Sequence, residues 1–194
     1  MSKGSNFNVV PNSTTTVGTT LENLKAAVTG ETGATTKYSA YADWAEKAGY
    51  PQLARLWRAT AEAEKIHIEM EYKLVQKEDP DWPRPCADAP VEAPADLNLI
   101  DSANGEIYET SDMYPSFIKK AEEEDRQDAI KVFTRAKLAE AYHAERYLEA
   151  YNNIDKPDDE FYYLCPVCGY IHKGKVGIDA CPICGVPFEK FREF

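Results

Sequence analysis

Two of the three histidines lie in the same local pattern, in which a glutamate precedes the histidine by three positions. The pairs are Glu64 with His67 and Glu140 with His143. Residues three apart on a helix lie on one face, so each pair points a carboxylate and an imidazole in one direction. These donor types together bind transition metals. The two pairs therefore predict a metal site built by helices.

Three further carboxylates share this register. Glu31 and Glu106 each follow a glycine, and Glu109 lies three residues after Glu106. A helical glutamate usually faces solvent, but all of these fall where the apolar seam of a helix should continue. Five buried carboxylates would repel one another, and a buried ion costs several kcal/mol unless it is paired. Bound metal would remove that conflict.

The donor set matches the di-iron or di-manganese carboxylate site of helix bundles. In that arrangement two helices each give one glutamate, and two others each give a Glu-x-x-His pair. The present set exceeds the six-ligand pattern by one carboxylate, namely Glu109. The sequence therefore predicts a pair of metal ions rather than a single one.

Four of the five cysteines form a second constellation near the C-terminus. Cys165-Pro-Val-Cys168 and Cys181-Pro-Ile-Cys184 are each followed by glycine, a pattern typical of metal knuckles. Four thiolates make a tetrahedral site for iron or zinc. Spacing alone does not choose between these metals, although the surrounding aromatic residues favour iron. Cys86, the remaining cysteine, is predicted to be an incidental thiol.

Four segments combine helical periodicity with good helix-forming residues. They cover residues 20–48, 51–78, 97–124 and 126–153. Thr19 or Thr20 is predicted to cap the first helix. Gly49 is predicted to end that helix, and Pro51 to begin the second. Pro115 is predicted to bend or break the third.

Residues 79–96, between the second and third helices, hold five prolines and therefore predict a stiff, extended crossover. Four helices with one long crossover match a ferritin-like bundle better than a simple up-down bundle. The predicted fold is thus mainly α. We expect an N-terminal extension over 1–20, the ferritin-like four-helix bundle over 21–156, and a small metal-knuckle domain over 157–194.

Composition excludes several classes of protein. The 194 residues carry a net charge of −11, whereas DNA and anionic membranes attract clustered positive charge. No apolar stretch approaches the roughly 18 residues of a membrane helix. Residues 1–20 lack the basic start and apolar core of a secretion signal. We therefore expect a cytoplasmic protein with neither nucleic acid nor membrane as its partner.

Taken together, these motifs resemble the rubrerythrin family from about Leu21 to Phe194. The motifs that carry the resemblance are Gly30-Glu31, Glu64-x-x-His67, Gly105-Glu106-x-x-Glu109 followed by Met113-Tyr114-Pro115, Glu140-x-x-His143 and the paired Cys-Pro-x-Cys-Gly. The resemblance implies a non-haem di-iron pair in the bundle, oxo-bridged when oxidised. It also implies a rubredoxin-like tail that holds one iron, for which zinc could substitute.

By this resemblance, Glu64 and Glu140 would bridge the two irons. Glu31 would bind the first iron, and Glu106 with His143 would bind the second. The tail iron would be held by Cys165, Cys168, Cys181 and Cys184.

The resemblance also implies which residues take part in catalysis. The first iron would exchange Glu109 for His67 as the pair is reduced. Tyr38, two turns after Glu31 on the same seam, could donate a hydrogen bond to a ligand or to peroxide.

The implied activity is that of a peroxidase in oxidative-stress defence, which reduces hydrogen peroxide to water. Its electrons would come from NADH through a redox partner protein and the tail iron. The family generally forms a homodimer in which the tail of one subunit lies near the di-iron site of the other.

Two alternatives stay open at this point. A ferritin-like protein would oxidise and store iron, although storage needs no incoming electrons. A zinc-ribbon binding module would leave the inward-facing carboxylates unexplained.

Overall fold

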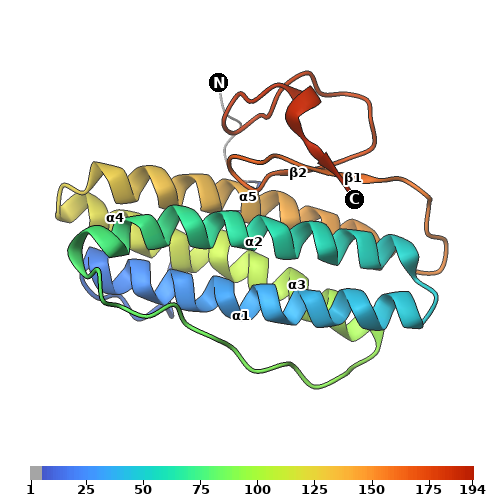
Figure 1. Ribbon diagram of the computed structural model, residues 1–194, viewed down its shortest axis with the longest axis horizontal. Coiled ribbons are helices and arrows are strands. Elements are labelled where there is room, and N and C mark those ends of the chain that lie inside the picture. Colours follow the sequence, from blue (N-terminus) through green and yellow to red (C-terminus); the bar gives the residue numbers. More distant parts are fainter. Residues whose placement is uncertain (1–5) are drawn as a thin grey trace.

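Four long helical segments build the molecule, as the computed structural model of residues 6–194 shows (Figure 1). They are α1 (Thr20–Lys47), α2 (Pro51–Glu78), α3 (Ala95–Tyr108) continued through η1 (Glu109–Met113) and α4 (Tyr114–Glu123), and α5 (Gln127–Asn152). The four segments run side by side as a bundle, with α1 packed mainly on α2 and α3 on α5. The predicted four-helix bundle with a long crossover is confirmed. Within the described residues, no helix is both long and apolar enough to cross a membrane.

Local signals at the ends of the first two helices act as predicted. Thr19 and Glu22 form a capping box, in which each side chain accepts a hydrogen bond from the other residue's backbone N–H. Gly49 follows the end of α1 with φ of 84°, a conformation that favours glycine, and Pro51 is the first residue of α2. The chain therefore reverses within three residues and sets α1 and α2 side by side.

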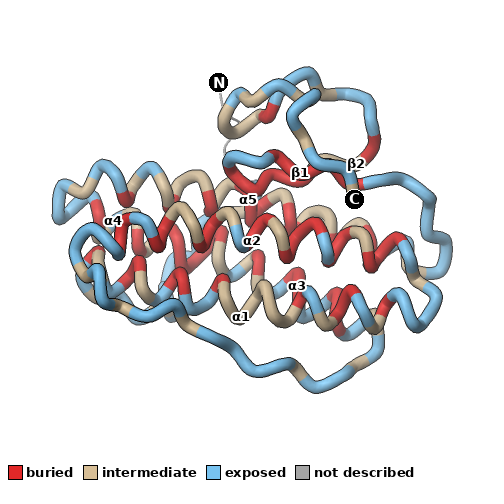
Figure 2. The backbone as a smooth tube through the Cα atoms, viewed as in Figure 1, coloured by how far each residue is buried: buried red, intermediate tan, exposed pale blue. Residues whose placement is uncertain are grey.

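The crossover from α2 to α3 lies outside the bundle and is mostly exposed (Figures 1 and 2). Trp82 fixes its beginning, because the Tyr72 hydroxyl donates to the Trp82 carbonyl at 2.9 Å. The Lys25 ammonium group lies over the Trp82 ring, 5.7 Å from its centroid. Cys86 is an exposed, unpaired thiol in this segment.

The predicted break at Pro115 takes another form, because the third segment continues past this residue. The irregularity lies just before it, in the π-helical turn η1, where the Tyr114 N–H donates to the Glu109 carbonyl five residues back. Pro115 has no N–H to offer the carbonyl four residues before it, that of Ser111. The Val10 N–H donates to this carbonyl instead, at 3.0 Å.

The N-terminal extension is thus attached to the bundle by hydrogen bonds from residues 10–15. Residues 1–5 of the predicted extension lie outside the described residues. The carboxylate of Asp112, in η1, accepts hydrogen bonds from the Ser13 hydroxyl and from the Thr14 backbone N–H and hydroxyl, the last two at 2.9 Å. The segment therefore braces the π-helical turn that contains Glu109.

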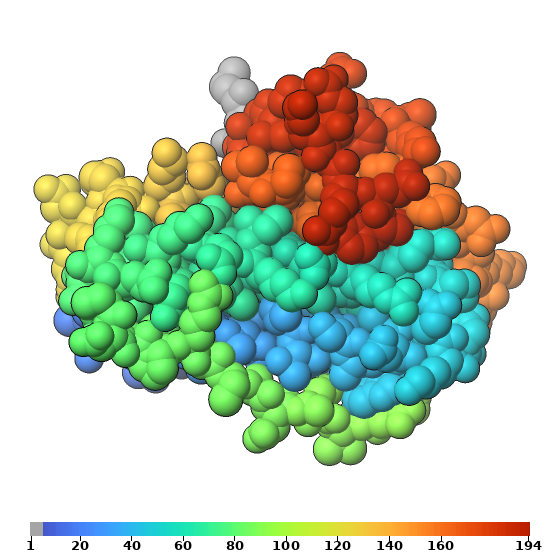
Figure 3. Space-filling model, viewed as in Figure 1, coloured from blue at the N-terminus to red at the C-terminus, as the bar shows by residue number. Residues whose placement is uncertain are grey.

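The tail is a small three-stranded antiparallel sheet in the order β2-β1-β3. Its elements are β1 (Tyr162–Leu164), β2 (Ile171–Lys173), the 3-10 turn η2 (Phe188–Lys190) and β3 (Arg192–Glu193). Leu164 and Ile171 are buried in the same apolar cluster as Trp57 of α2. In the single chain the tail therefore rests on its own bundle, over α2 and α5 (Figures 1 and 3). The family resemblance predicts that in a homodimer the tail also lies near the site of the second subunit, and this stays a prediction.

Two apolar clusters fill the bundle at either end. One contains Tyr38, Trp57 and Tyr147, and the other contains Leu24 and Phe133. Along α1, the buried Glu31 lies between Leu24 of one cluster and Tyr38 of the other. The middle of the bundle is therefore the polar part, and the two ends supply the hydrophobic stabilisation.

The contact between the N-terminal segment and Asp112 gives a prediction for stability. Burial alone would raise the pKa of Asp112, but hydrogen bonds from Ser13 and Thr14 outweigh it and lower the pKa to about 2. The unfolded value is about 3.9. A lowered folded pKa stabilises the protein above the unfolded pKa, and this contribution is lost as the pH falls through the folded pKa.

We therefore expect Asp112→Asn to reduce the free energy of unfolding by about 2 kcal/mol at pH 7 and by much less near pH 2. Denaturant unfolding of both proteins at the two pH values measures this. Asp88→Asn, in the exposed crossover, is the control and should change little. An equal loss at both pH values would mean that the Asp112 charge does not hold the segment.

Candidate metal centres

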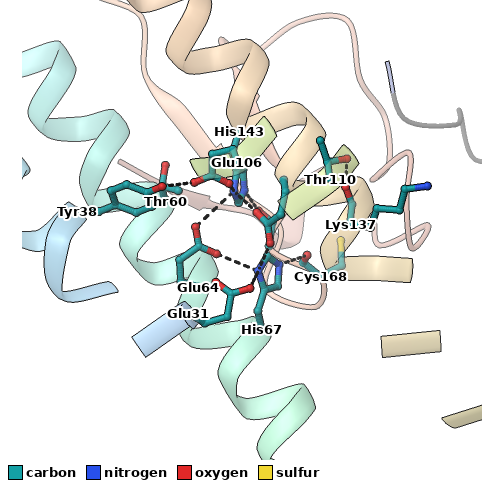
Figure 4. A network of polar contacts seen from close by, with 12 residues as sticks. Glu31, Tyr38, Thr60, Glu64, His67, Glu106, Thr110, Lys137, His143 and Cys168 are labelled. Carbon is teal, nitrogen blue, oxygen red and sulfur yellow. Dashed lines mark hydrogen bonds and ion pairs between the residues drawn. The ribbon is translucent and has the colours of Figure 1, made fainter. Parts of the chain in front are cut away.

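Six of the predicted ligands meet in the middle of the bundle, and each is fully buried. They come from four segments: Glu31 of α1, Glu64 and His67 of α2, Glu106 of α3, and Glu140 and His143 of α5. In Figure 4, the labelled side chains of five of these ligands, all except Glu140, point toward one another from these helices. Each segment supplies at least one ligand, so the site forms only when the whole bundle is assembled.

These six residues form two overlapping groups of four. Glu31, Glu64, His67 and Glu140 offer ligand atoms that all lie within 4.8 Å of one another, and so do Glu64, Glu106, Glu140 and His143. Glu64 and Glu140 belong to both groups. The arrangement fits two adjacent metal ions that share these two carboxylates.

The histidine rings are oriented by the tail. His67 Nε2 lies 3.1 Å from the Cys168 carbonyl, and His143 Nε2 lies 2.8 Å from the Gly169 carbonyl. A carbonyl only accepts hydrogen bonds, so each Nε2 carries a proton and donates it. In a neutral imidazole the other nitrogen, Nδ1, then keeps its lone pair. The tail therefore fixes the tautomer that a metal ligand requires.

Both Nδ1 atoms face carboxylates at close range. His67 Nδ1 lies 2.7 Å from Glu140 Oε1 and 2.9 Å from Glu64 Oε2, and His143 Nδ1 lies 2.8 Å from Glu140 Oε2. His67 Nδ1 nevertheless has no partner in hydrogen-bond geometry. The two carboxylate oxygens of Glu64 and the two of Glu140 also have none. Lone pairs that converge without pairing are the arrangement of a metal cage.

The pKa shifts of the buried side chains also indicate a metal site. Burial raises the pKa of Glu31, and so do the charges of Glu109 and Glu64. Burial lowers the pKa of His67, but Glu140 outweighs this and raises it. The protein without metal must therefore hold extra protons in its interior. Metal cations replace these protons, and the residues present fit an iron pair.

Two tyrosine hydroxyls donate hydrogen bonds to ligand carboxylates of the bundle site. The Tyr38 hydroxyl donates to Glu106 at 2.5 Å, and the Tyr114 hydroxyl donates to Glu31. Both tyrosines are buried. Each hydroxyl fixes one carboxylate of the site, and each fixed carboxylate belongs to a different metal position.

Glu109 lies beside the site but in neither group of four. Its side chain extends from the π-helical turn η1 and is half-buried. Burial and the charge of Glu106 raise the pKa of Glu109. The seventh predicted ligand is therefore close enough to interact with the other carboxylates, yet stands apart from the six that converge.

The sequence pattern missed one buried acid, Glu71. This residue is fully buried and accepts a hydrogen bond from the Tyr114 hydroxyl at 2.9 Å. The inward face of α2 that contains Glu64 and His67 could continue through the apolar Met70 or through Glu71, and Met70 is only half-buried. Glu71 lies four residues after His67 and seven after Glu64, so helical spacing alone could have identified it.

The four tail cysteines form a second cluster, with three of them buried. Their sulfur atoms lie 3.4 Å apart for Cys165 and Cys184, 3.7 Å for Cys165 and Cys168, and 3.5 Å for Cys168 and Cys181. A tetrahedral metal with bonds of about 2.3 Å to sulfur would separate the sulfurs by about 3.8 Å. The cluster therefore fits one metal ion.

The two knuckles share one backbone design. Gly169 and Gly185 both have φ of 78°, and their N–H groups donate to the carbonyls of Cys165 and Cys181. Tyr170 and Phe191 pack against the cysteines. Only the Gly169 knuckle touches the bundle site, because a Cβ atom at Gly169 would lie 2.5 Å from His67 Nε2, whereas one at Gly185 would meet nothing within 4 Å.

Comparisons with known proteins agree with both centres. The family model for rubrerythrin matches residues 22–151, and the model for the rubrerythrin rubredoxin-like domain matches residues 163–192. Nigerythrin of Nitratidesulfovibrio vulgaris (strain Hildenborough) is 59% identical over 97% of this chain and 93% of its own. Rubrerythrin of Clostridium perfringens is 36% identical over 90% of this chain and 95% of its own.

Solved structures are similar over the same extent. Nigerythrin in its fully reduced, all-ferrous state has a TM-score of 0.95 to this structure, covering 98% of this chain and 94% of that one. The two metal centres, the two matched models and this similarity agree. The chain therefore belongs to the rubrerythrin family, with a di-iron site in its bundle and a single-iron site in its rubredoxin-like tail.

Proposed function

We propose that the protein is a peroxidase that reduces hydrogen peroxide to water at the bundle site. Electrons enter one at a time through the tail iron and come ultimately from NADH by way of a redox partner protein. The observation that carries this proposal is the hydrogen bond between His67 Nε2 and the Cys168 carbonyl. It joins a residue of each metal centre.

The link is short and specific. Cys168 is one of the four tail cysteines, and its own carbonyl accepts from His67, so a few covalent bonds and one hydrogen bond separate the two sites. The Gly169 carbonyl makes the equivalent bond to His143. An iron-storing protein has no need for a one-electron centre attached to its ligands, which disfavours the ferritin-like alternative.

A relative supports redox cycling. Nigerythrin has been solved in fully reduced, partially reduced and mixed-valence states. A reduced iron pair would supply the two electrons that break the O–O bond of peroxide. The protein side chains hold this site in place, with Tyr38 donating to Glu106 and Tyr114 to Glu31. The tail contacts α2 and α5, and His67 and His143 are fully buried beneath it.

The position of Glu109 suits an exchangeable ligand. It is one turn beyond Glu106, outside both groups of four, and lies on a π-helical turn. We assign it as the residue that replaces His67 on the first iron when the pair is oxidised. An iron that keeps His67 in both redox states would rule out this assignment.

The two units of the chain then have separate tasks. Residues 21–156 hold the peroxide site, and residues 157–194 receive electrons. Val167, beside the knuckle cysteines, is partly exposed and offers the redox partner an approach to the tail iron. A homodimer, as the family resemblance implies, would add the bundle of a second subunit to this arrangement.

Removing the tail metal should separate electron supply from peroxide chemistry. Cys181→Ser leaves every bundle ligand intact. We expect NADH-linked turnover with a redox partner to fall at least a hundredfold, while a chemically reduced bundle still consumes peroxide in a single turnover. Stopped-flow kinetics with iron analysis measure both. Full NADH-linked activity without tail iron would show that electrons enter elsewhere.

The two knuckle glycines provide a matched test of the link. Ala at either position suffers the same backbone strain, but only Gly169→Ala also collides with His67. We expect Gly169→Ala to slow electron transfer from the tail to the bundle at least tenfold relative to Gly185→Ala, with iron content equal in both. Rapid-mixing spectroscopy of tail oxidation measures it. Equal rates in the two variants would argue against this route.

A further inference from the structure

Glu71 has no task in the proposed function, although it is one of the most deeply buried acids of the chain. It belongs to neither group of metal ligands. Among the described residues it forms no ion pair with a basic side chain, and its Oε2 atom has no hydrogen-bond partner. A buried carboxylate without a counter-charge is costly, so its protonation state needs an explanation.

The hydrogen bonds of Tyr114 supply that explanation. Tyr114 Oη contacts Glu31 Oε1 on one side and Glu71 Oε1 on the other, the latter at 2.9 Å. A phenol has one proton and can donate only one of these bonds. If both acids were ionised, the second contact would join two lone pairs. One of the two carboxyl groups must therefore carry a proton.

Metal binding determines which of the two acids, Glu31 or Glu71, carries the proton. Glu31 belongs to the first group of ligands, and a ligand carboxylate is ionised when metal is bound. Tyr114 then donates to Glu31, and the proton belongs on Glu71, which donates to Tyr114. Glu71 is also fully buried, with its Oε2 atom unpartnered, and burial of this kind favours the neutral acid. The hydrogen bonds thus run in one direction, from Glu71 through Tyr114 to Glu31.

We propose that Glu71 is a proton donor to the bundle site, acting through Tyr114. The role rests on the proposed function, because reducing H2O2 to two water molecules breaks the O–O bond and takes up two electrons and two protons. The electrons come from the reduced metal pair. One proton leaves Glu71 for Tyr114 Oη while the Tyr114 proton passes to Glu31 Oε1 and on to a peroxide oxygen. The second proton comes from solvent, which also reprotonates Glu71 between turnovers.

Two substitutions separate proton donation from positioning. Glu71→Gln keeps the shape and an N–H that can donate to Tyr114, but has no proton to release. Glu71→Leu removes both capacities. Glu69→Gln, two residues earlier on the same helix, is the control, because Glu69 is a partly exposed partner of Arg84. Iron analysis and the visible spectrum establish that each variant holds its metals.

The first measurement does not depend on activity. The infrared spectrum of the reduced, iron-loaded protein should contain the carbonyl band of a protonated carboxylic acid, which shifts in D2O. This band should disappear in Glu71→Gln and remain in Glu69→Gln. Its absence from the unsubstituted protein, or a Glu71→Gln spectrum that loses no such band relative to the unsubstituted protein, would overturn the proposal even if no variant were active.

The second measurement is the single-turnover rate of peroxide consumption by the prereduced proteins. We expect Glu71→Gln and Glu71→Leu to be at least tenfold slower than the unsubstituted protein, and Glu69→Gln to be unchanged. An unchanged rate in Glu71→Gln would show that Glu71 only positions Tyr114. If the unsubstituted protein consumed no peroxide, the proposed function itself would fail, an outcome that differs from a slow variant.

Discussion

The main constraint on this structure is the mutual repulsion of carboxylates enclosed in the middle of a helix bundle, which something must offset. Glu31, Glu64, Glu106 and Glu140 are all fully buried and point toward one another. Without metal, that repulsion is relieved by protons held in the interior and by the hydrogen bonds from Tyr38 and Tyr114. The apolar clusters at the two ends of the bundle stabilise the helices, and cations bound between the carboxylates would stabilise the middle. Metal binding and assembly of the bundle are therefore coupled.

A second consequence concerns the tail. His67 and His143 must present Nδ1 to the carboxylates, which requires a hydrogen-bond acceptor at Nε2. Consecutive carbonyls of the first knuckle provide these acceptors, so the group that orients the ligands also connects the two metal centres. The absence of a side chain at Gly169 permits this approach. Orientation of the ligands and the proposed electron route thus depend on the same two hydrogen bonds.

Much of this was predictable from sequence, because helical spacing places side chains in fixed directions. Both ends of α1 and the beginning of α2 followed from Thr19, Gly49 and Pro51, and the converging ligands followed from the Glu-x-x-His pairs. The response to Pro115 was not predictable, because the free carbonyl of Ser111 is satisfied by Val10, a residue distant in sequence. Glu71 was missed because Met70, the apolar residue before it, also fits the inward face of α2. Docking of the tail on its own bundle likewise depends on contacts between distant residues.

The central claim is that these buried acids exist to hold two irons, next to a third iron in the tail. Anomalous scattering at the iron edge, from crystals of the iron-loaded protein in oxidised and reduced states, tests it most directly. The account predicts three peaks per chain in both states, two of them between Glu64 and Glu140 and one among the four cysteines. One of the two bundle peaks should move between His67 and Glu109 as the redox state changes. A single peak in the bundle, or none, would contradict the account.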